Sequence, residues 1–185
     1  MARFKTFICM GLFVLIAVSS SPARGDLPDD VEKSLRQFVQ GFYDWYVPTV
    51  RKERGISGSN LVLRHKSSSF SPELLRAIEA DSTAQAKSPN ELVGLDFDPF
   101  VNAQEYADSC AAGKIVHKGD RYFVQIHCTW SGRKSAKSDV VPELTLNEGQ
   151  WSFVNFHYGK FERSKHENLL SILKVLRANR RGNHQ

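Results

Sequence analysis

The chain has 185 residues, 41% of them hydrophobic, which is enough for one domain with a hydrophobic core. Its formal net charge of +5 is uneven: residues 1–25 carry +3 and residues 160–185 carry +5, which leaves −3 for residues 26–159. A nucleic-acid-binding protein needs a basic patch on its folded body, so this distribution argues against nucleic acid as a partner. No stretch after residue 25 is apolar enough for a transmembrane segment.

Residues 1–25 have the pattern of a secretory signal peptide. Basic residues precede an apolar run over residues 7–18, and Ala23-Arg24-Gly25 resembles a small-residue cleavage site. The run is shorter than the roughly 20 residues that a membrane-spanning helix needs. Cys9 lies inside the run rather than just after it, so we expect no lipid-anchored cysteine. The sequence therefore predicts a periplasmic or secreted protein.

After this segment we expect a single domain over residues 26–178 and a basic tail over residues 179–185. The domain begins with an amphipathic helix that is predicted to end at Pro48, and its apolar residues recur at spacings of four and three. These residues are Val31, Leu35, Phe38, Phe42 and Trp45. Tyr43 and Trp45 crowd the end of the helix. Such a cluster is usually core, but a wall on which a ligand stacks is the alternative, so both are binding candidates.

The next part of the chain predicts a loop and then a second helix. Residues 49–60 are rich in Arg, Lys and Gly and precede a short apolar piece at residues 61–63. Ser71-Pro72-Glu73 predicts a helix start, with an N-cap, a proline at the first helical position and an acid in the first turn. We expect this helix to fade into a polar loop over residues 82–90.

The least ordinary stretch is Leu95-Asp96-Phe97-Asp98-Pro99-Phe100. Strand alternation would place Asp96 and Asp98 on the face opposite the apolar residues. Pro99 disfavours a helical conformation for the residue before it, so Asp98-Pro99 predicts a helix start, with Asp98 as N-cap and Pro99 at the first helical position. In this structural interpretation Asp98 caps the turn at residues 100–104, and Asp96 fixes the approach to it. The functional alternative is that the two carboxylates hold a cation or a basic partner, although they are too few for a calcium loop.

Two cysteines remain after the predicted signal peptide, and they frame a predicted hairpin. A three-residue loop at Lys118-Gly119-Asp120 pairs His117 with Arg121, and the same register places Cys110 opposite Cys128. Directly opposed residues lie close to disulfide distance, and an exported protein meets an oxidising compartment. We therefore predict a Cys110–Cys128 disulfide, with two buried thiols as the alternative.

The second half of the chain is rich in predicted strands. These lie near residues 111–117, 121–130, 140–146 and 150–158. A hairpin turn is expected at Asn147-Glu148-Gly149, and an apolar helix at residues 169–176. Helices followed by antiparallel strands predict an α+β domain in which helices cover one face of the sheet.

Hairpin parity divides the first two strands into two faces. The predicted core face consists of Cys110, Ala112, Val116, Tyr122, Val124, Ile126, Cys128 and Trp130. The other face consists of Gly113, Ile115, His117, Arg121, Phe123, Gln125 and His127. The second face mixes apolar and polar groups, as a concave pocket or a half-exposed sheet would, so His127 is a binding candidate.

Five linked motifs suggest a family. They are Phe38-x-x-x-Phe42-Tyr43-x-Trp45-Tyr46, Ser71-Pro72-Glu73-Leu74-Leu75, the 95–100 hexapeptide with Gln104, Trp151-x-x-x-Asn155-x-x-Tyr158, and the leucine-rich segment 169–176. Together they resemble a family of bacterial exported proteins and lipoproteins whose domain has no known function.

The resemblance implies a cone-like α+β domain of the nuclear-transport-factor-2 and ketosteroid-isomerase class. In such a domain a curved antiparallel sheet of about four strands packs on N-terminal helices, followed by a C-terminal helix. The resemblance carries over no activity and no catalytic residues. The chain departs from the lipoprotein members of this family because it lacks the cysteine of a lipobox, so we expect a soluble rather than an anchored periplasmic protein.

No catalytic pattern is present, so we assign no catalytic residue. There is no G-x-S-x-G elbow and no glycine-rich phosphate loop, so no cofactor is expected. His117 and His127 share a predicted face but lie several rungs apart, so no metal site is expected either. Gln104 and Asn155 are further binding candidates. Asn155 is predicted to be a buried amide that clamps backbone groups, or alternatively to present its amide to a ligand.

The leading hypothesis is a non-enzymatic exported domain that binds a partner protein or a small ligand in the cell envelope. The alternative is an isomerase- or hydrolase-type enzyme with a pocket between helix and sheet, in which Asp96 or Asp98 is the base beside Tyr43 or Tyr158. A third possibility is a structural or immunity-type protein that blocks a partner's site with its acidic body. The binding candidates are Tyr43, Trp45, Asp96, Asp98, Gln104, His127 and Asn155.

Overall fold

The computed structural model describes residues 27–88, 90–159 and 167–182; the predicted signal peptide lies outside them. The helices are α1 (Asp29–Lys52), α2 (Gly58–His65), the 3-10 helix η1 (Ser67–Ser69), α3 (Pro72–Lys87) and α4 (Leu169–Gly182). The strands are β1 (Ser109–Lys118), β2 (Arg121–Trp130), β3 (Arg133–Lys134), β4 (Val141–Asn147) and β5 (Gln150–His157). Helix α4 includes residues 179–182, the first part of the predicted basic tail.

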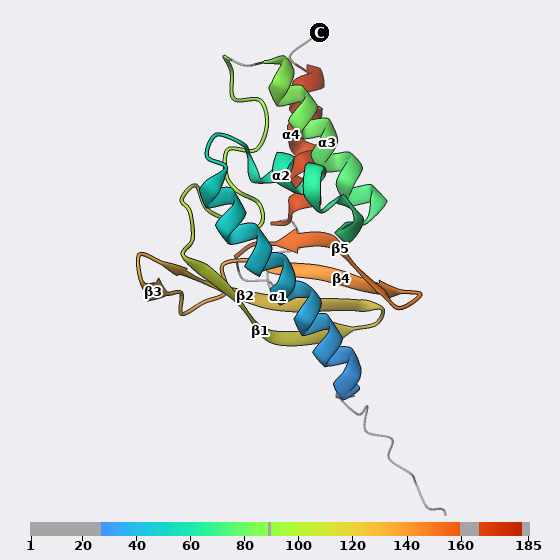
Figure 1. Ribbon diagram of the computed structural model, residues 1–185. Helices are drawn as coiled ribbons and strands as arrows, with labels where there is room; N and C mark the ends of the chain where they lie inside the picture. The colour runs from blue at the N-terminus through green and yellow to red at the C-terminus, as the bar shows by residue number, and fades with distance from the viewer. Residues whose placement is uncertain (1–26, 89, 160–166, 183–185) are drawn as a thin grey trace, which may run out of the picture.

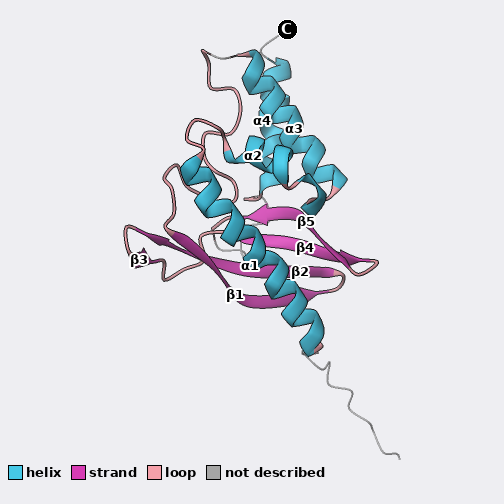
Figure 2. Cartoon of the chain, in the orientation of Figure 1, coloured by secondary structure: helices cyan, strands magenta, loops and turns pink. Residues whose placement is uncertain are grey.

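The strands form one antiparallel sheet in the order β1-β2-β4-β5, with the short β3 paired to β2. The sheet is curved and open, α1 runs across one face, and α2, α3 and α4 gather beyond β5 (Figure 1). The predicted α+β class is therefore confirmed, including the curved antiparallel sheet, the N-terminal helices and the C-terminal helix (Figure 2).

The predicted disulfide between Cys110 and Cys128 is confirmed, but the predicted hairpin loop is wrong. Lys118 pairs with Arg121, so the loop has two residues, Gly119 and Asp120, and Gly119 has a positive φ of 63°. A β-bulge between Ala112 and Ile115 then shifts the register by one residue and returns Cys110 to the position opposite Cys128. The two departures from the predicted hairpin compensate each other at the cysteines.

The bulge changes which side chains share a face. Ile115 pairs with Val124 and packs against the core, so its prediction for the outer face is wrong, and Val116 moves off the core face. His117 pairs with Tyr122 and stacks on its ring at 4.5 Å. His127 lies opposite Ala111 on the other face of the hairpin. The prediction that His117 and His127 share a face is therefore wrong.

The predicted helix end at Pro48 is wrong, because α1 continues to Lys52. Proline removes one backbone donor from the helix, but packing compensates: Val47 and Val50 are both buried. The Thr49 hydroxyl also donates to the carbonyl oxygen of Trp45 at 2.6 Å.

Two further helices extend into predicted loops. Helix α2 begins at residues 58–60, the end of the predicted 49–60 loop, and includes the apolar piece at residues 61–63; its N-cap Ser57 accepts a hydrogen bond from the backbone of Asn60. Helix α3 starts as predicted, with Ser71 as N-cap, but it continues to Lys87 through most of the predicted loop. The reason is tertiary, because the second half of α3 packs against α4 and the 92–95 segment.

Aromatic rings fill the space between α1 and the sheet. Phe42 lies at the centre, with ring centroids between 5.0 and 6.0 Å from those of six neighbours. These neighbours are Tyr43, Trp45, Tyr46, Phe70, Phe100 and Phe153. Phe100 is fully buried, so the end of the 95–100 hexapeptide is anchored in the core. This anchor fixes the position of Asp98, two residues before it.

Candidate functional site

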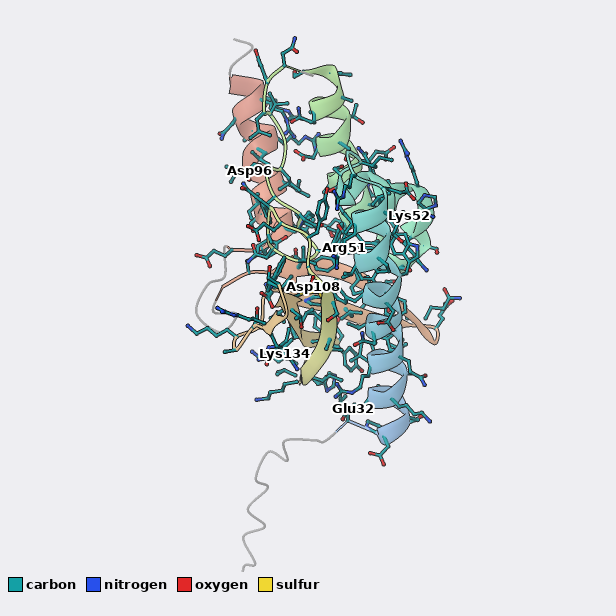
Figure 3. The ribbon with its side chains drawn as sticks, turned by 60° about the vertical axis from the view of Figure 1, so that its left-hand side comes forward. Glu32, Arg51, Lys52, Asp96, Asp108 and Lys134 are labelled. Carbon is teal, nitrogen blue, oxygen red and sulfur yellow. A yellow bond between two sulfur atoms is a disulfide. The ribbon has the colours of Figure 1, made fainter. Side chains whose placement is uncertain are left out.

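A groove of about 520 Å³ lies between the start of α2, the second half of α3 and residues 92–106. We call it the acidic groove, because its lining includes the carboxylates of Asp96, Asp98 and Glu105. Its apolar lining includes Ile56, Leu92, Leu95, Phe97 and Tyr106. Figure 3 shows Asp96 on the segment that descends from the end of α3 toward β1. The groove is not the predicted pocket between helix and sheet, because aromatic side chains occupy that space.

Asp98 lies at the base of the groove and caps a turn. Its Oδ1 accepts a hydrogen bond from the backbone of Phe100 at 2.9 Å, and its carbonyl oxygen accepts one from Asn102 at 2.8 Å. Asn102 has a positive φ of 55°, which ends the turn without an α-helix. The cap predicted for Asp98 is thus confirmed, but the predicted helix start is wrong, because residues 99–102 form a turn. The strand alternation predicted for residues 95–98 is not found either.

The second oxygen of Asp98 accepts a hydrogen bond from the Tyr46 hydroxyl at 2.6 Å. Burial raises the pKa of Asp98 from 3.8 to about 6, although the hydrogen bonds from Tyr46 and from the backbone of Phe100 and Val101 act in the opposite direction. Burial also raises the pKa of Tyr46 well above 10. Gly58 makes this arrangement possible, because a Cβ there would overlap the Tyr46 hydroxyl.

Three tyrosines fix the Asp98-Pro99-Phe100 tripeptide. Besides the Tyr46 contact, the Tyr43 hydroxyl donates to the carbonyl oxygen of Phe100 at 2.9 Å, and the Tyr158 hydroxyl donates to that of Pro99 at 3.1 Å. Tyr43 and Tyr46 are three residues apart on α1 and therefore lie on the same side of the helix. The position of the Asp98 carboxylate is thus set by α1 and by Tyr158, the residue that follows β5.

An ion pair between two helices holds the other wall of the groove. Arg180 of α4 donates from Nη1 to Asp81 Oδ1 of α3 and to the carbonyl oxygen of Val93, both at 2.7 Å. Asp81 Oδ2 accepts a hydrogen bond from the backbone of Leu95 at 3.0 Å. The side chain of Gln85 holds the backbone between them, because its Oε1 accepts hydrogen bonds from Val93 and Gly94.

Of the predicted candidates, the structure brings Asp96, Asp98 and Gln104 together in the acidic groove. The carboxylate of Asp96 is exposed, and the Gln104 side chain donates to the Asp96 carbonyl oxygen at 3.1 Å. Tyr43 touches this site only through the backbone of Phe100, because its ring is buried.

The other candidates lie elsewhere. Trp45 lies on a separate shallow hollow, with the Lys66 ammonium 5.1 Å from its ring centroid. His127 lies on the outer face of β2, where Nδ1 is 3.3 Å from the carbonyl oxygen of Ser135. Asn155 is buried: its amide nitrogen donates to the side chain of Asn168, and its oxygen accepts from the backbone of Phe156 and Leu170. This is the predicted clamp on backbone groups.

Sequence reasoning missed Tyr46, Asp81 and Arg180. Tyr46 carried a signal, because it is three residues after Tyr43 in the aromatic cluster that was singled out. Asp81 and Arg180 carried none, since they are 99 residues apart and each looks like a surface residue of its helix.

The described residues contain no group of three or more His, Cys, Asp or Glu side chains arranged to hold a metal ion. None of the helices described is long and apolar enough to cross a membrane. Comparisons of the chain with protein-family models, with curated proteins and with solved structures found no match.

Proposed function

We propose that the protein is an exported domain of the cell envelope, and that its acidic groove binds a basic segment of a partner protein. The observation that carries this proposal is the pairing of three carboxylates with exposed apolar side chains in one groove. Asp96, Asp98 and Glu105 form no ion pair with any described residue. A lysine or arginine side chain would complement them.

The apolar rim supports a peptide as the occupant. Leu92 is 69% exposed and Tyr106 is 45% exposed, and these are two of the three large hydrophobic side chains that are exposed among the described residues. Exposed apolar side chains that gather at one groove are typical of interaction sites. The Tyr106 ring already lies 6.0 Å from the Arg54 guanidinium, which illustrates how this rim contacts a cation.

A larger hollow lies beside the disulfide, but its charges make it a weaker candidate for binding a basic segment than the acidic groove. It measures about 610 Å³ and its lining includes Asp44, Arg51, Lys52 and Asp108. Its charges are of both signs, and Arg51 is already paired with Asp108 at 3.3 Å (Figure 3). It therefore offers a ligand little net charge.

The test uses short blocked peptides that contain lysine and leucine, with matched peptides in which glutamate replaces lysine. Backbone NMR shifts would be followed during titration. We expect the lysine peptides to shift amides at residues 92–106 and at the start of α2, and the glutamate peptides to leave them unchanged. Asp96→Asn with Asp98→Asn should weaken binding about tenfold or more, because charge-assisted hydrogen bonds are lost.

The matched control is Asp120→Asn with Glu148→Gln, which removes the same charge from exposed hairpin turns. An equal loss of binding in this control would contradict the proposal, since only the overall charge would then matter. The single variant Asp96→Asn controls for a folding defect, because the Asp96 side chain is exposed and only its backbone oxygen accepts a hydrogen bond from a described side chain.

A second candidate is an enzyme that abstracts a proton, with Asp98 as the base. The raised pKa of Asp98 and its hydrogen bond to Tyr46 favour it. Against it, each oxygen of Asp98 already accepts a hydrogen bond from the protein. Incorporation of solvent deuterium into a panel of cyclic ketones by the wild type, but not by Asp98→Asn, would favour the enzyme over the binding protein.

A further inference from the structure

A second groove lies on the other side of α3 and has the opposite charge. It measures about 440 Å³ and runs between α3 and α4. We call it the basic groove, because Arg76, Lys174, Arg177 and Arg180 line it, against one acid, Glu73. Its floor is apolar and includes Ala77, Ala80, Leu170 and Leu173.

Three of these cations have no ionic partner among the residues that the structure describes. Arg76, Lys174 and Arg177 are exposed, and none forms an ion pair with a carboxylate among the described residues. The fourth, Arg180, is fixed by Asp81 and by the carbonyl oxygen of Val93, so it forms a rigid end of the groove.

The cations of the basic groove are not placed where they would stabilise α3 or α4. Cations stabilise the last turn of a helix, but Arg76 lies in the first half of α3 and Lys174 in the middle of α4. Within α4, Arg177 lies three residues from Lys174 and from Arg180, and like charges at this spacing repel each other. The described part of α4 contains no acidic residue that would offset this repulsion.

We propose that the basic groove binds the phosphate ester of a glycerol-phosphate group, either free or as the head group of a lipid. Arginine side chains bind phosphate oxygens in a bidentate manner, and two arginines from facing helices line the groove together with Lys174. Their positive charge exceeds that of the single carboxylate, Glu73, and so complements an anionic phosphate ester. The apolar floor accommodates the carbon skeleton. This proposal does not depend on the function proposed for the acidic groove.

The test has a soluble arm and a membrane arm. In the first, glycerol phosphate is titrated into the full chain, and shifts of backbone amides in α3 and α4 are followed by NMR. In the second, the chain is sedimented with vesicles of phosphatidylglycerol in phosphatidylcholine. Vesicles of phosphatidylcholine alone give the baseline. Any binding through the apolar run at residues 7–18 also occurs with these vesicles, so it is removed when the baseline is subtracted.

We expect Arg76→Gln with Arg177→Gln to weaken binding about tenfold or more, because two charge-assisted contacts are lost. The matched control, Arg64→Gln with Arg133→Gln, removes two exposed arginines from α2 and β3 and should leave binding unchanged. Binding in the soluble arm identifies a free phosphate ester, and binding in the membrane arm alone identifies a lipid head group. Failure to bind in both arms, or an equal loss in the two double variants, would overturn the proposal.

Discussion

The acidic groove and the basic groove share α3 but are built in different ways. In the acidic groove, Asp98 is buried and accepts hydrogen bonds from Tyr46 of α1 and from the backbone of its own turn, so its position is set by the core. In the basic groove, exposed cations project from two regular helices without partners among the described residues. The first site is therefore preorganised, whereas the second relies on the spacing of its charges. The Asp81–Arg180 ion pair joins the two, because Asp81 lines the first groove and Arg180 lines the second.

The largest effect on the free energy of unfolding is expected at the Asp81–Arg180 ion pair. Replacing Arg180 by Met leaves Asp81 as a buried carboxylate without its cation, since the Asp81 side chain is only 8% exposed. We expect a loss of about 3 kcal/mol in the free energy of unfolding, measured by urea denaturation. Adding Asp81→Asn should recover part of this loss, because the amide oxygen can still accept the hydrogen bond from Leu95. A single variant as stable as the wild type would show that the two grooves are not joined in this way.

The disulfide should affect the stability of the fold but neither groove. Cys110 and Cys128 are 18 residues apart, and the bridge restricts the unfolded chain, which predicts a loss of about 3 kcal/mol for Cys110→Ala with Cys128→Ala. Urea denaturation with and without reductant measures it. A midpoint that reductant leaves unchanged would contradict the prediction, and a change in peptide or glycerol-phosphate binding by the folded variant would show that the bridge shapes a groove.

Asp98→Asn should make the protein more stable at neutral pH while it weakens the binding of a cation. The pKa of Asp98 is raised to about 6 in the fold, so its stabilising contribution is fully present below about pH 4 and is lost as the pH rises through 6. Asparagine resembles the protonated form. We expect the variant to gain about 2 kcal/mol over the wild type at pH 8 and almost nothing at pH 4. A variant that is less stable than the wild type at pH 8 would indicate a purely structural carboxylate.

The smallest effect is expected for the exposed ion pair of Arg51 with Asp108. Their side chains are 45% and 36% exposed, so solvent screens the interaction. Arg51→Gln should change the free energy of unfolding by about 0.5 kcal/mol or less. Asp81–Arg180 is also an ion pair of aspartate and arginine, but it is buried. Comparing the two variants therefore measures how much burial increases the contribution of such a pair to the free energy of unfolding. Equal losses in the free energy of unfolding for Arg51→Gln and Arg180→Met would contradict the expected difference between the exposed and the buried ion pair.

Local patterns predicted the parts of the fold that depend on neighbours in sequence. The N-cap at Ser71, the turn at Asp98, the α+β order and the disulfide all followed from spacing. The hairpin register was right at Cys110 and Cys128 only because the bulge compensated for the shorter loop. The sequence of the hairpin did not predict the bulge, because Gly113, which lies within it, is also compatible with a regular strand.

Tertiary packing decided the features that the sequence did not predict. Helix α1 passes Pro48 because buried valines follow and precede it, and α3 extends to Lys87 because α4 and the 92–95 segment cover it. At the acidic groove, Asp96, Asp98 and Gln104 were found because they are close in sequence. Asp81 was not, because its role depends on Arg180, at the other end of the domain.

The central claim is that Asp98 is a buried carboxylate that is ready to receive a cation. An NMR titration of the Asp98 side-chain carboxyl, with and without a lysine-containing peptide, tests this claim most directly. We predict a pKa of about 6 in the free protein and a lower pKa with the peptide, because a bound cation favours the charged form. A pKa near 3.8 that the peptide leaves unchanged would contradict the claim.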